Sequence, residues 1–243
     1  MSNTIERPKL PEVITFTGAD DGTDAKHLLE MHEENESGAP PGRPSIEFGI
    51  LFSPSLTGQP RYPSAQWVSR MMGIAGGRIK LAAHICGGYS RELLETGTIR
   101  QLAPLLAEGA FGRVQINTAD PRVLEKAPSI ADWGSRLNVK VILQSRDPVT
   151  FPAELPGISW LYDASGGRGI LPAQWPQEFG DRLVGNAGGL NSKNISHAVR
   201  SISTRARRYW VDLETGARDE NDRFAITTCR EICRIVGEAL EGA

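Results

Sequence analysis

The chain has 243 residues, 40% of them apolar, and its 27 Lys and Arg residues nearly balance its 29 Asp and Glu residues. This balance argues against a basic field for nucleic acid or an anionic membrane surface, so any anion must be recognised locally. The length is sufficient for one large core in a single domain.

Three cysteines, Cys86, Cys229 and Cys233, are too few and too unevenly spaced for a disulfide framework. Cys229 and Cys233 lie one helical turn apart, which could orient two metal ligands, but no companion Cys/His pair is present, so we expect a packed helix face. The polar start MSNTIERPKLPEV and the lack of a long apolar run predict a soluble cytoplasmic protein without a signal peptide.

Short runs with strand character alternate with segments of helical character along the chain. The expected strands are Val13–Gly18, Ile46–Ser53, Ile79–Cys86, Gly112–Asn117, Val139–Gln144, Ile158–Asp163, Leu183–Asn186 and Tyr209–Leu213. The expected helices include Pro63–Ile74, Ser90–Leu106, Asn194–Ile202 and Phe224–Leu240. The alternation predicts an α/β fold with a parallel sheet, and about eight such units suit a (β/α)8 TIM barrel, although a doubly wound open sheet fits equally well.

Two segments are expected to be irregular additions to a single barrel domain that spans residues 1–243. Residues 1–10 are interpreted as a lead-in. The segment Glu33–Ser45, EENESGAPPGRPS, is rich in Gly, Pro and charge, which predicts a long loop between the first helix and the second strand.

The carboxyl ends of the expected strands are unusually polar, and in a barrel the active site is built at these ends. The last three strands run into YDASGGRG, GNAGGLNSKN and VDLETGARD, where glycines follow the strand and a helix is expected to follow the glycines. Backbone N–H groups at such helix starts favour phosphate, and Thr215 adds a hydroxyl donor. A simple tight turn at Gly188 and Gly189 is the alternative. Arg61, in QPRY, suits a carboxylate or phosphate.

These motifs, taken in order, resemble those of the phosphoribosylanthranilate isomerase family, the tryptophan-pathway barrels that convert phosphoribosylanthranilate to its carboxyphenylamino-deoxyribulose phosphate isomer. TFTG stands where the family has K-I-C-G, and FGILF followed by QPRY stands for G-F-V-F and S-P-R-Y. VQIN, LYDASGGRG, GNAGGLNSKN and VDLETGAR match the fourth, sixth, seventh and eighth units. The resemblance covers nearly the whole chain, and the last three units together are specific.

The resemblance implies a role for each matching position. Asp163 is the general acid that protonates the ribose ring oxygen, Arg61 binds the anthranilate carboxylate, and Asp212 lines the pocket. The phosphate is then bound by the backbone of Gly167, Gly169, Gly188, Gly189 and Gly216 together with Thr215. It implies a small phosphorylated substrate, no metal or other cofactor, no nucleic acid or membrane partner, and a monomer or homodimer.

The sequence departs from the family pattern at the base. The cysteine expected to remove the C2′ proton is Thr17, whose hydroxyl has no usable basicity without a neighbouring base. Asn117 replaces the usual histidine of the fourth strand, and Arg218 replaces the last acidic residue of the eighth motif.

Three interpretations therefore remain open. The protein is an isomerase with a relocated base, an enzyme that runs another reaction on a phosphosugar, or a non-catalytic binder of a phosphorylated metabolite. The candidates for a relocated base are Asp20, Asp21, Asp212, His84 and Cys86.

Overall fold

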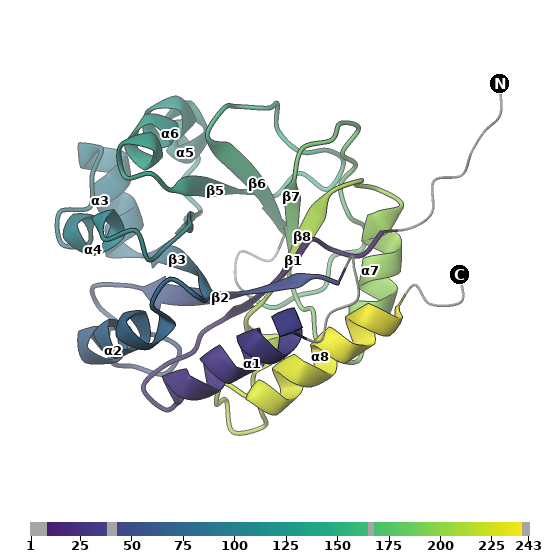
Figure 1. Cartoon of the computed structure of the whole chain (residues 1–243). Helices are drawn as coiled ribbons and strands as arrows, with labels where there is room; N and C mark the ends of the chain where they lie inside the picture. Colours follow the sequence, from purple (N-terminus) through teal and green to yellow (C-terminus); the bar gives the residue numbers. More distant parts are fainter. Residues whose placement is uncertain (1–8, 38–42, 165–167, 240–243) are drawn as a thin grey trace.

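Eight strands pair in parallel, each with the next along the chain, and the last strand closes onto the first (Figure 1). The computed structural model describes residues 9–37, 43–164 and 168–239. The strands are β1 (Val13–Thr17), β2 (Ser45–Phe52), β3 (Lys80–Cys86), β4 (Arg113–Asn117), β5 (Lys140–Ser145), β6 (Ile158–Asp163), β7 (Val184–Ala187) and β8 (Tyr209–Leu213). The prediction of a single-domain (β/α)8 TIM barrel is confirmed.

Helices cover most of the barrel's outer surface. They are α1 (Ala25–Ser37), α2 (Ala65–Ala75), α3 (Gly88–Thr96), α4 (Ala103–Ala107), α5 (Arg122–Glu125), α6 (Ala127–Arg136), α7 (Ile195–Ser203), the 3₁₀ turn η1 (Thr215–Ala217) and α8 (Ile226–Glu238). The large core lies between helices and strands, because alternate strand residues such as Ile14, Phe16 and Phe48 are fully buried there. The expected helical segment Ser90–Leu106 is divided into two helices: α3 ends at Thr96, and the left-handed backbone of Gly97 caps it before α4 begins.

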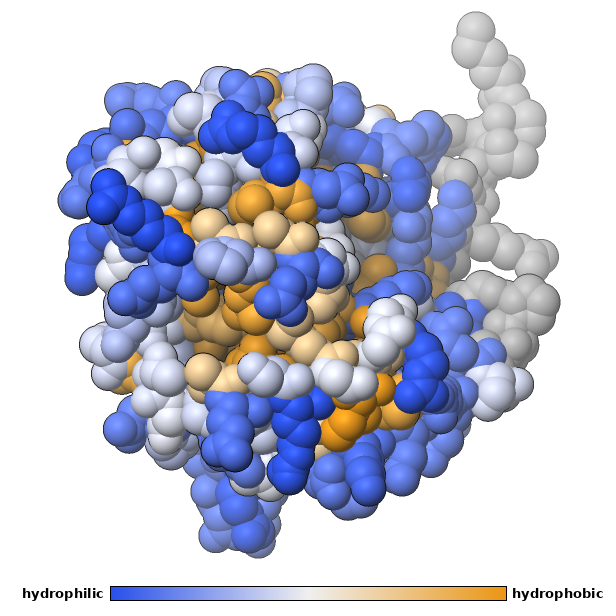
Figure 2. All heavy atoms as spheres, turned by 60° about the vertical axis from the view of Figure 1, so that its left-hand side comes forward, coloured by the Kyte–Doolittle hydropathy of each residue, from blue (hydrophilic) through white to orange (hydrophobic). Residues whose placement is uncertain are grey.

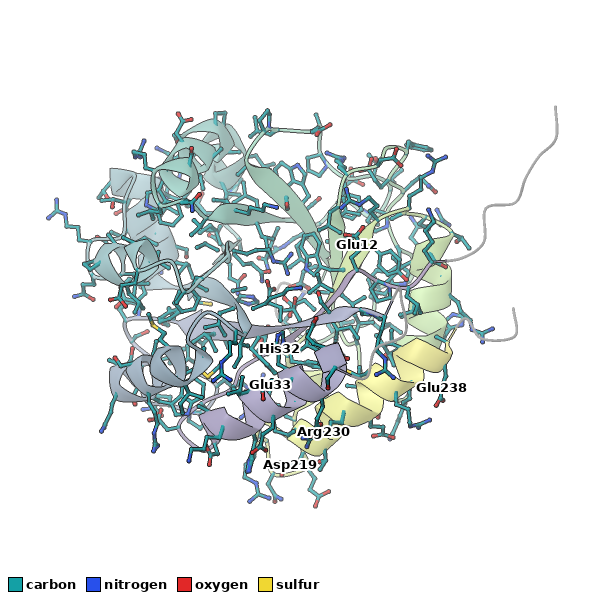
Figure 3. All side chains as sticks on the ribbon, in the orientation of Figure 1. Glu12, His32, Glu33, Asp219, Arg230 and Glu238 are labelled. Atoms are coloured by element: carbon teal, nitrogen blue, oxygen red, sulfur yellow. The ribbon has the colours of Figure 1, made fainter. Side chains whose placement is uncertain are left out.

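The expected loop Glu33–Ser45 is also wrong at its start. Helix α1 continues to Ser37, since Glu33 pairs with Arg78 at 2.7 Å and buried Asn35 donates its side-chain amide to the carbonyl of Pro44. Glu34 pairs with Arg230 of α8, which lies beside α1 (Figures 1 and 3). Residues 38–42 of the expected loop lie outside the described residues.

Two of the connections between strands contain no helix in the described part of the chain. After β5, residues 146–157 are irregular, and after β6, residues 168–183 are irregular. The two connections support each other: the N–H of Gln177 donates to the carbonyl of Val149 at 2.9 Å, and Thr150 and Gln177 form a parallel bridge. Buried aromatic rings cover the strands where these helices are absent from the described chain. Trp175 packs edge-on against Tyr162 of β6 at a centroid distance of 6.1 Å. The expected helix after the sixth-strand glycines is therefore wrong for the described residues.

The interior of the barrel is partly charged. Arg113 of β4 donates to buried Glu47 of β2 at 2.8 Å and lies over the Trp210 ring at 4.6 Å from its centroid. Thr15 donates to the same carboxylate at 3.0 Å. Gly185 makes room for the Trp210 ring, because a Cβ there would stand 2.3 Å from it.

The outer surface carries an apolar hollow on one side. Figure 2 turns the left-hand side of Figure 1 forward and shows hydrophobic side chains gathered around a central depression with hydrophilic ones at its rim. A groove of about 450 Å³ runs between α2 and α4, lined by residues that include Met72 and Leu105. No helix within the described ranges is both long and apolar enough to cross a membrane.

Candidate active site

A cavity of about 520 Å³ opens at the carboxyl ends of the strands. Most of its strand residues lie at or near the carboxyl ends of the strands, which is where a barrel builds its active site. Its lining includes Thr17, His84, Gln115, Asn117, Gln144, Asp163, Gly169, Gly188, Gly189, Asn191, Lys193, Asp212, Glu214, Thr215, Gly216 and Arg218. The structure thus brings together most of the residues singled out from the sequence.

Asp163 is the last residue of β6 and its side chain lies in the cavity wall. It is only 5% exposed, and the amide of Gln144 on the neighbouring strand donates to its Oδ2 at 3.4 Å. A carboxyl group with little water around it and an amide donor beside it is held in one orientation, as a proton donor to a bound molecule needs to be.

Asp212 of β8 faces the same cavity, and Thr17 of β1 donates its hydroxyl to Asp212 Oδ1 at 2.8 Å. Burial raises the pKa of Asp212 to about 7, partly opposed by the Thr17 hydrogen bond, while the negative charges of Glu47 and Asp163 raise the pKa further. Thr17 therefore acts on Asp212 as a hydrogen-bond donor. A carboxyl group with a pKa near 7 can gain or lose a proton at neutral pH.

His84 of β3 lies beside Thr17 across a glycine. A Cβ on Gly49 would stand 2.3 Å from Thr17 Oγ1 and 2.8 Å from His84 Nε2, so glycine is needed for both side chains to fit. His84 is 1% exposed, its Nε2 has no partner within the described structure, and burial lowers its pKa to about 4. The ring is therefore a neutral group at physiological pH.

Cys86, the other sequence candidate on β3, is not among the cavity-lining residues. Its sulfur accepts from the amide of Asn117 at 3.4 Å, and burial raises the pKa of the Cys86 thiol to about 12. The thiol is protonated at neutral pH, which removes it from the role of a base.

Three glycine-containing loops stack on one another at one side of the cavity. A Cβ on Gly189 would stand 2.5 Å from the backbone nitrogen of Leu171, and one on Gly216 would stand 1.9 Å from the carbonyl oxygen of Leu190. Gly169, Gly188 and Gly189 have positive φ angles of 66°, 111° and 63°. Close loop packing and backbone direction thus both require glycine here. Gly167 lies outside the described residues.

Arg61 lies at the edge of this site and is not among the residues that line the cavity. Its guanidinium makes salt bridges at 2.7 Å to both Glu214 and Asp222, and Nη1 also donates to Thr215 at 3.3 Å. Partial burial lowers the pKa of Arg61, but the hydrogen bonds to Asp222 and Glu214 outweigh it and the pKa is raised.

Two aspartates proposed as relocated bases hold loops instead. Asp20 accepts from the backbone N–H of Arg61 at 2.7 Å and from Arg218 at 3.2 Å. Asp21 accepts from the backbone N–H of Ser64 at 2.7 Å. Arg218, in place of the acidic residue of the eighth motif, also donates to the carbonyl of Gly18 at 2.6 Å. These bonds fasten the loops after β1, β2 and β8 together.

Several of the lining residues had not been singled out from the sequence, among them Gln115, Gln144, Lys193 and Glu214. Gln144 was visible as the polar end of the fifth strand, and Lys193 lies in the quoted GNAGGLNSKN. Nothing in the linear sequence indicated that Glu214 would contact Arg61, since the two residues are 153 positions apart.

No protein-family model and no curated protein matches the sequence. Among solved structures, the crystal structure of phosphoribosyl anthranilate isomerase from Thermus thermophilus superposes with a TM-score of 0.61 at 16% identity, covering 93% of this chain and 98% of that one. TrpF from Jonesia denitrificans superposes with a TM-score of 0.59 at 14% identity, covering 95% of this chain and 99% of that one. At these identities the likeness establishes a shared barrel fold over nearly the full length of all three chains.

Proposed function

We propose that this protein is a phosphoribosylanthranilate isomerase-like enzyme that converts a phosphorylated ribosylamine to the corresponding aminoketose phosphate, an Amadori-type aldose–ketose isomerisation. The observation that carries the proposal is the placement of two buried carboxyl groups, Asp163 and Asp212, in one cavity walled on one side by stacked glycine loops. The full-length likeness to solved structures of this enzyme family supports it.

The glycine loops supply a phosphate subsite in this proposal. Within the described chain, the backbone N–H groups of Gly189 and Gly216 donate to no protein acceptor, and both residues line the cavity. Lys193 lines the same cavity and provides a cation, and Thr215 provides a hydroxyl. Amide donors combined with a lysine ammonium group form an environment suited to a phosphate dianion.

Asp163 takes the role of the general acid. It gives a proton to the ring oxygen, the bond from C1 to that oxygen breaks with its electron pair on the oxygen, and the nitrogen lone pair forms an iminium. A base then removes the C2 proton, and the resulting enol rearranges to the ketone. No oxidant, reductant or metal is needed for this sequence of steps.

Asp212 takes the role of the base. It lines the cavity, its pKa lies at about 7, and a hydrogen bond from Thr17 fixes its orientation. Asp20 and Asp21 are committed to loop contacts, and Cys86 holds its proton. His84 lines the cavity, but with a pKa of about 4 it is the weaker base. In this proposal, the carboxylate of Asp212 on β8 takes the place of the family's thiolate on β1, and Thr17 of β1 orients that carboxylate.

The experiment is a turnover assay with two substrates, phosphoribosylanthranilate and its carboxamide counterpart, read by product fluorescence and mass spectrometry. Conversion of at least one substrate by the wild type, lost in Asp163→Asn, is expected. Lys126→Gln, at the N-cap of α6 and not among the residues that line the cavity, serves as the control substitution and should leave turnover unchanged. Absence of conversion of both substrates would reject the isomerase proposal.

A non-catalytic binder of a phosphorylated metabolite is the second candidate, favoured by Thr17 in the position of the family's cysteine. It predicts saturable binding of a phosphosugar without product. The proposal further includes a cytoplasmic protein, monomeric or dimeric, that takes a small phosphorylated molecule, while a place in tryptophan biosynthesis depends on which substrate is converted.

A further inference from the structure

Arg61 is the arginine that the sequence motifs predict to bind an anionic group of the substrate. In the structure its guanidinium is already bound by two carboxylates of the protein, those of Glu214 and Asp222. Nη1 donates to Glu214 Oε1 at 2.7 Å and Nη2 donates to Asp222 Oδ1 at 2.7 Å. Nε adds a longer bond to Asp222 Oδ2 at 3.4 Å. One arginine that faces two carboxylates has no excess positive charge to offer a third.

Glu214 links this arginine to the cavity, because it both binds Arg61 and belongs to the cavity lining. It follows β8 directly, two positions after Asp212, and its side chain is about one third exposed at 32%. A substrate group that approached Arg61 from the cavity would meet the Glu214 carboxylate.

The charged side chains that line the cavity also disfavour a carboxylate on the substrate. Among the described residues, five carboxyl groups line it, those of Asp163, Asp212, Glu214, Glu220 and Glu231, and two cationic side chains do so, those of Lys193 and Arg218. Arg218 is already bound to Asp20, Asp222 and the carbonyl of Gly18. The other polar side chains at the strand ends include the neutral amides of Gln115, Asn117 and Gln144, which suit hydroxyl, amide or amine groups.

We infer that Glu214 is a specificity-determining residue that disfavours a carboxylate on the nitrogen substituent of the substrate. The substrate class is therefore a phosphorylated ribosylamine whose nitrogen substituent is neutral or cationic, such as a carboxamide. This inference rests on the proposed function, since it concerns the same cavity and the same phosphosugar.

The test uses two stable probes, reduced N-aryl-1-amino-1-deoxypentitol 5-phosphates that differ only in an ortho carboxylate or an ortho carboxamide. Isothermal titration should show that the wild type binds the carboxamide at least tenfold more tightly. In Glu214→Gln the preference should shrink at least fivefold, because Arg61 then retains only Asp222 and can pair with the added carboxylate.

Two further variants separate this effect from a general change of charge. Glu220→Gln removes one carboxylate from the same cavity without a contact to Arg61, and it should leave the preference within twofold of wild type. Adding Arg61→Met to Glu214→Gln should cancel the gain for the carboxylate probe. Equal shifts in Glu220→Gln and Glu214→Gln would contradict a role for Glu214 in particular.

The outcomes distinguish this inference from the proposed function. Tight and equal binding of both probes by the wild type would overturn the inference and leave the phosphosugar site in place. Binding of neither probe would overturn both. The wild-type comparison alone remains decisive if a Glu214 variant does not fold.

Discussion

The rate of the proposed reaction should depend on the protonation state of Asp212. Its pKa is raised to about 7, chiefly by burial, so the carboxylate form needed for proton removal grows as the pH rises through 7. We expect kcat/KM to rise about tenfold per pH unit below 7 and to level off above it. Asp212→Asn should reduce turnover by at least 10²-fold. A rate that falls over the same pH range would assign the acid role to Asp212 and contradict the proposal.

The same shift predicts how stability depends on pH. The folded carboxyl binds its proton more tightly than the unfolded one, whose pKa lies near 4, so the unfolded state loses the proton first as the pH rises. Stability is therefore highest below the unfolded value and is lost between about pH 4 and 7. Relative to wild type, Asp212→Asn should be more stable at pH 8 by on the order of 2–4 kcal/mol and show no gain at pH 3.5. Urea unfolding at the two pH values measures the difference.

Thr17 is the residue at which a family-like base can be restored. It is 1% exposed and directed at Asp212, and a cysteine in its place would put a thiol beside the cavity. We expect Thr17→Cys to retain or raise isomerase turnover, whereas Thr17→Val, which keeps the shape and removes the donor, should lower it about tenfold or more. A turnover that is insensitive to Thr17→Val would show that the hydroxyl does not orient the base.

At the scale of elements, a glycine within strand β7 makes room for a large side chain in the barrel interior. Gly185 of β7 lies against the Trp210 ring. A Cβ added to Gly185 would stand 2.3 Å from that ring and 2.5 Å from Leu161. We expect Gly185→Ala to destabilise the fold by roughly 1–3 kcal/mol through overpacking. Gly73→Ala in α2 is the matched control: its added Cβ meets nothing within 4 Å, so it should be neutral or stabilising by about 0.5–1 kcal/mol. Equal thermal midpoints for the two variants would contradict this account of the interior.

The strands were predictable because each is a short apolar run bounded by turn residues, and β6 and β8 were placed to the residue. The connections were less predictable. Residues 146–157 and 168–183 are irregular, and their order comes from tertiary contacts such as Gln177 to Val149, which no local periodicity reveals. Helix α1 likewise extends into a charged segment because Glu33 pairs with Arg78, which follows α2, and Glu34 pairs with Arg230 of α8.

For the whole molecule, the ion pair between Glu47 of β2 and Arg113 of β4 connects two strands that are separated by β3, through the interior of the barrel. Both side chains are largely buried, with side-chain exposures of 6% and 11%. Arg113→Met would leave the Glu47 carboxylate without its partner and should cost about 3–5 kcal/mol. The double variant Arg113→Met with Glu47→Gln removes the uncompensated charge and should recover at least half of that loss in chemical unfolding. A double variant as unstable as the sum of both single variants would contradict this coupling.

The candidate site was predictable only in part, because some of its contacts join loops that are far apart in the sequence. Strand order and polar strand ends were enough to gather Asp163, Asp212 and the glycine loops, because a closed parallel barrel brings all carboxyl ends to one face. The state of Arg61 was not predictable, since its contacts with Glu214 and Asp222 join loops from β2 and β8. The raised pKa of Asp212 likewise depends on burial that the folded barrel alone creates.

Trp175, which packs against Tyr162, places a fluorescent indole in the helix-free connection that follows β6. Tyr162 directly precedes Asp163, and Trp175 belongs to the connection that also carries Gly169, a cavity-lining residue. A molecule that settles against this connection alters the surroundings of a nearly buried indole, whose emission depends on local polarity. We therefore expect ligand binding to change the emission of Trp175, one of the chain's five tryptophans, and Trp175→Phe should remove that change.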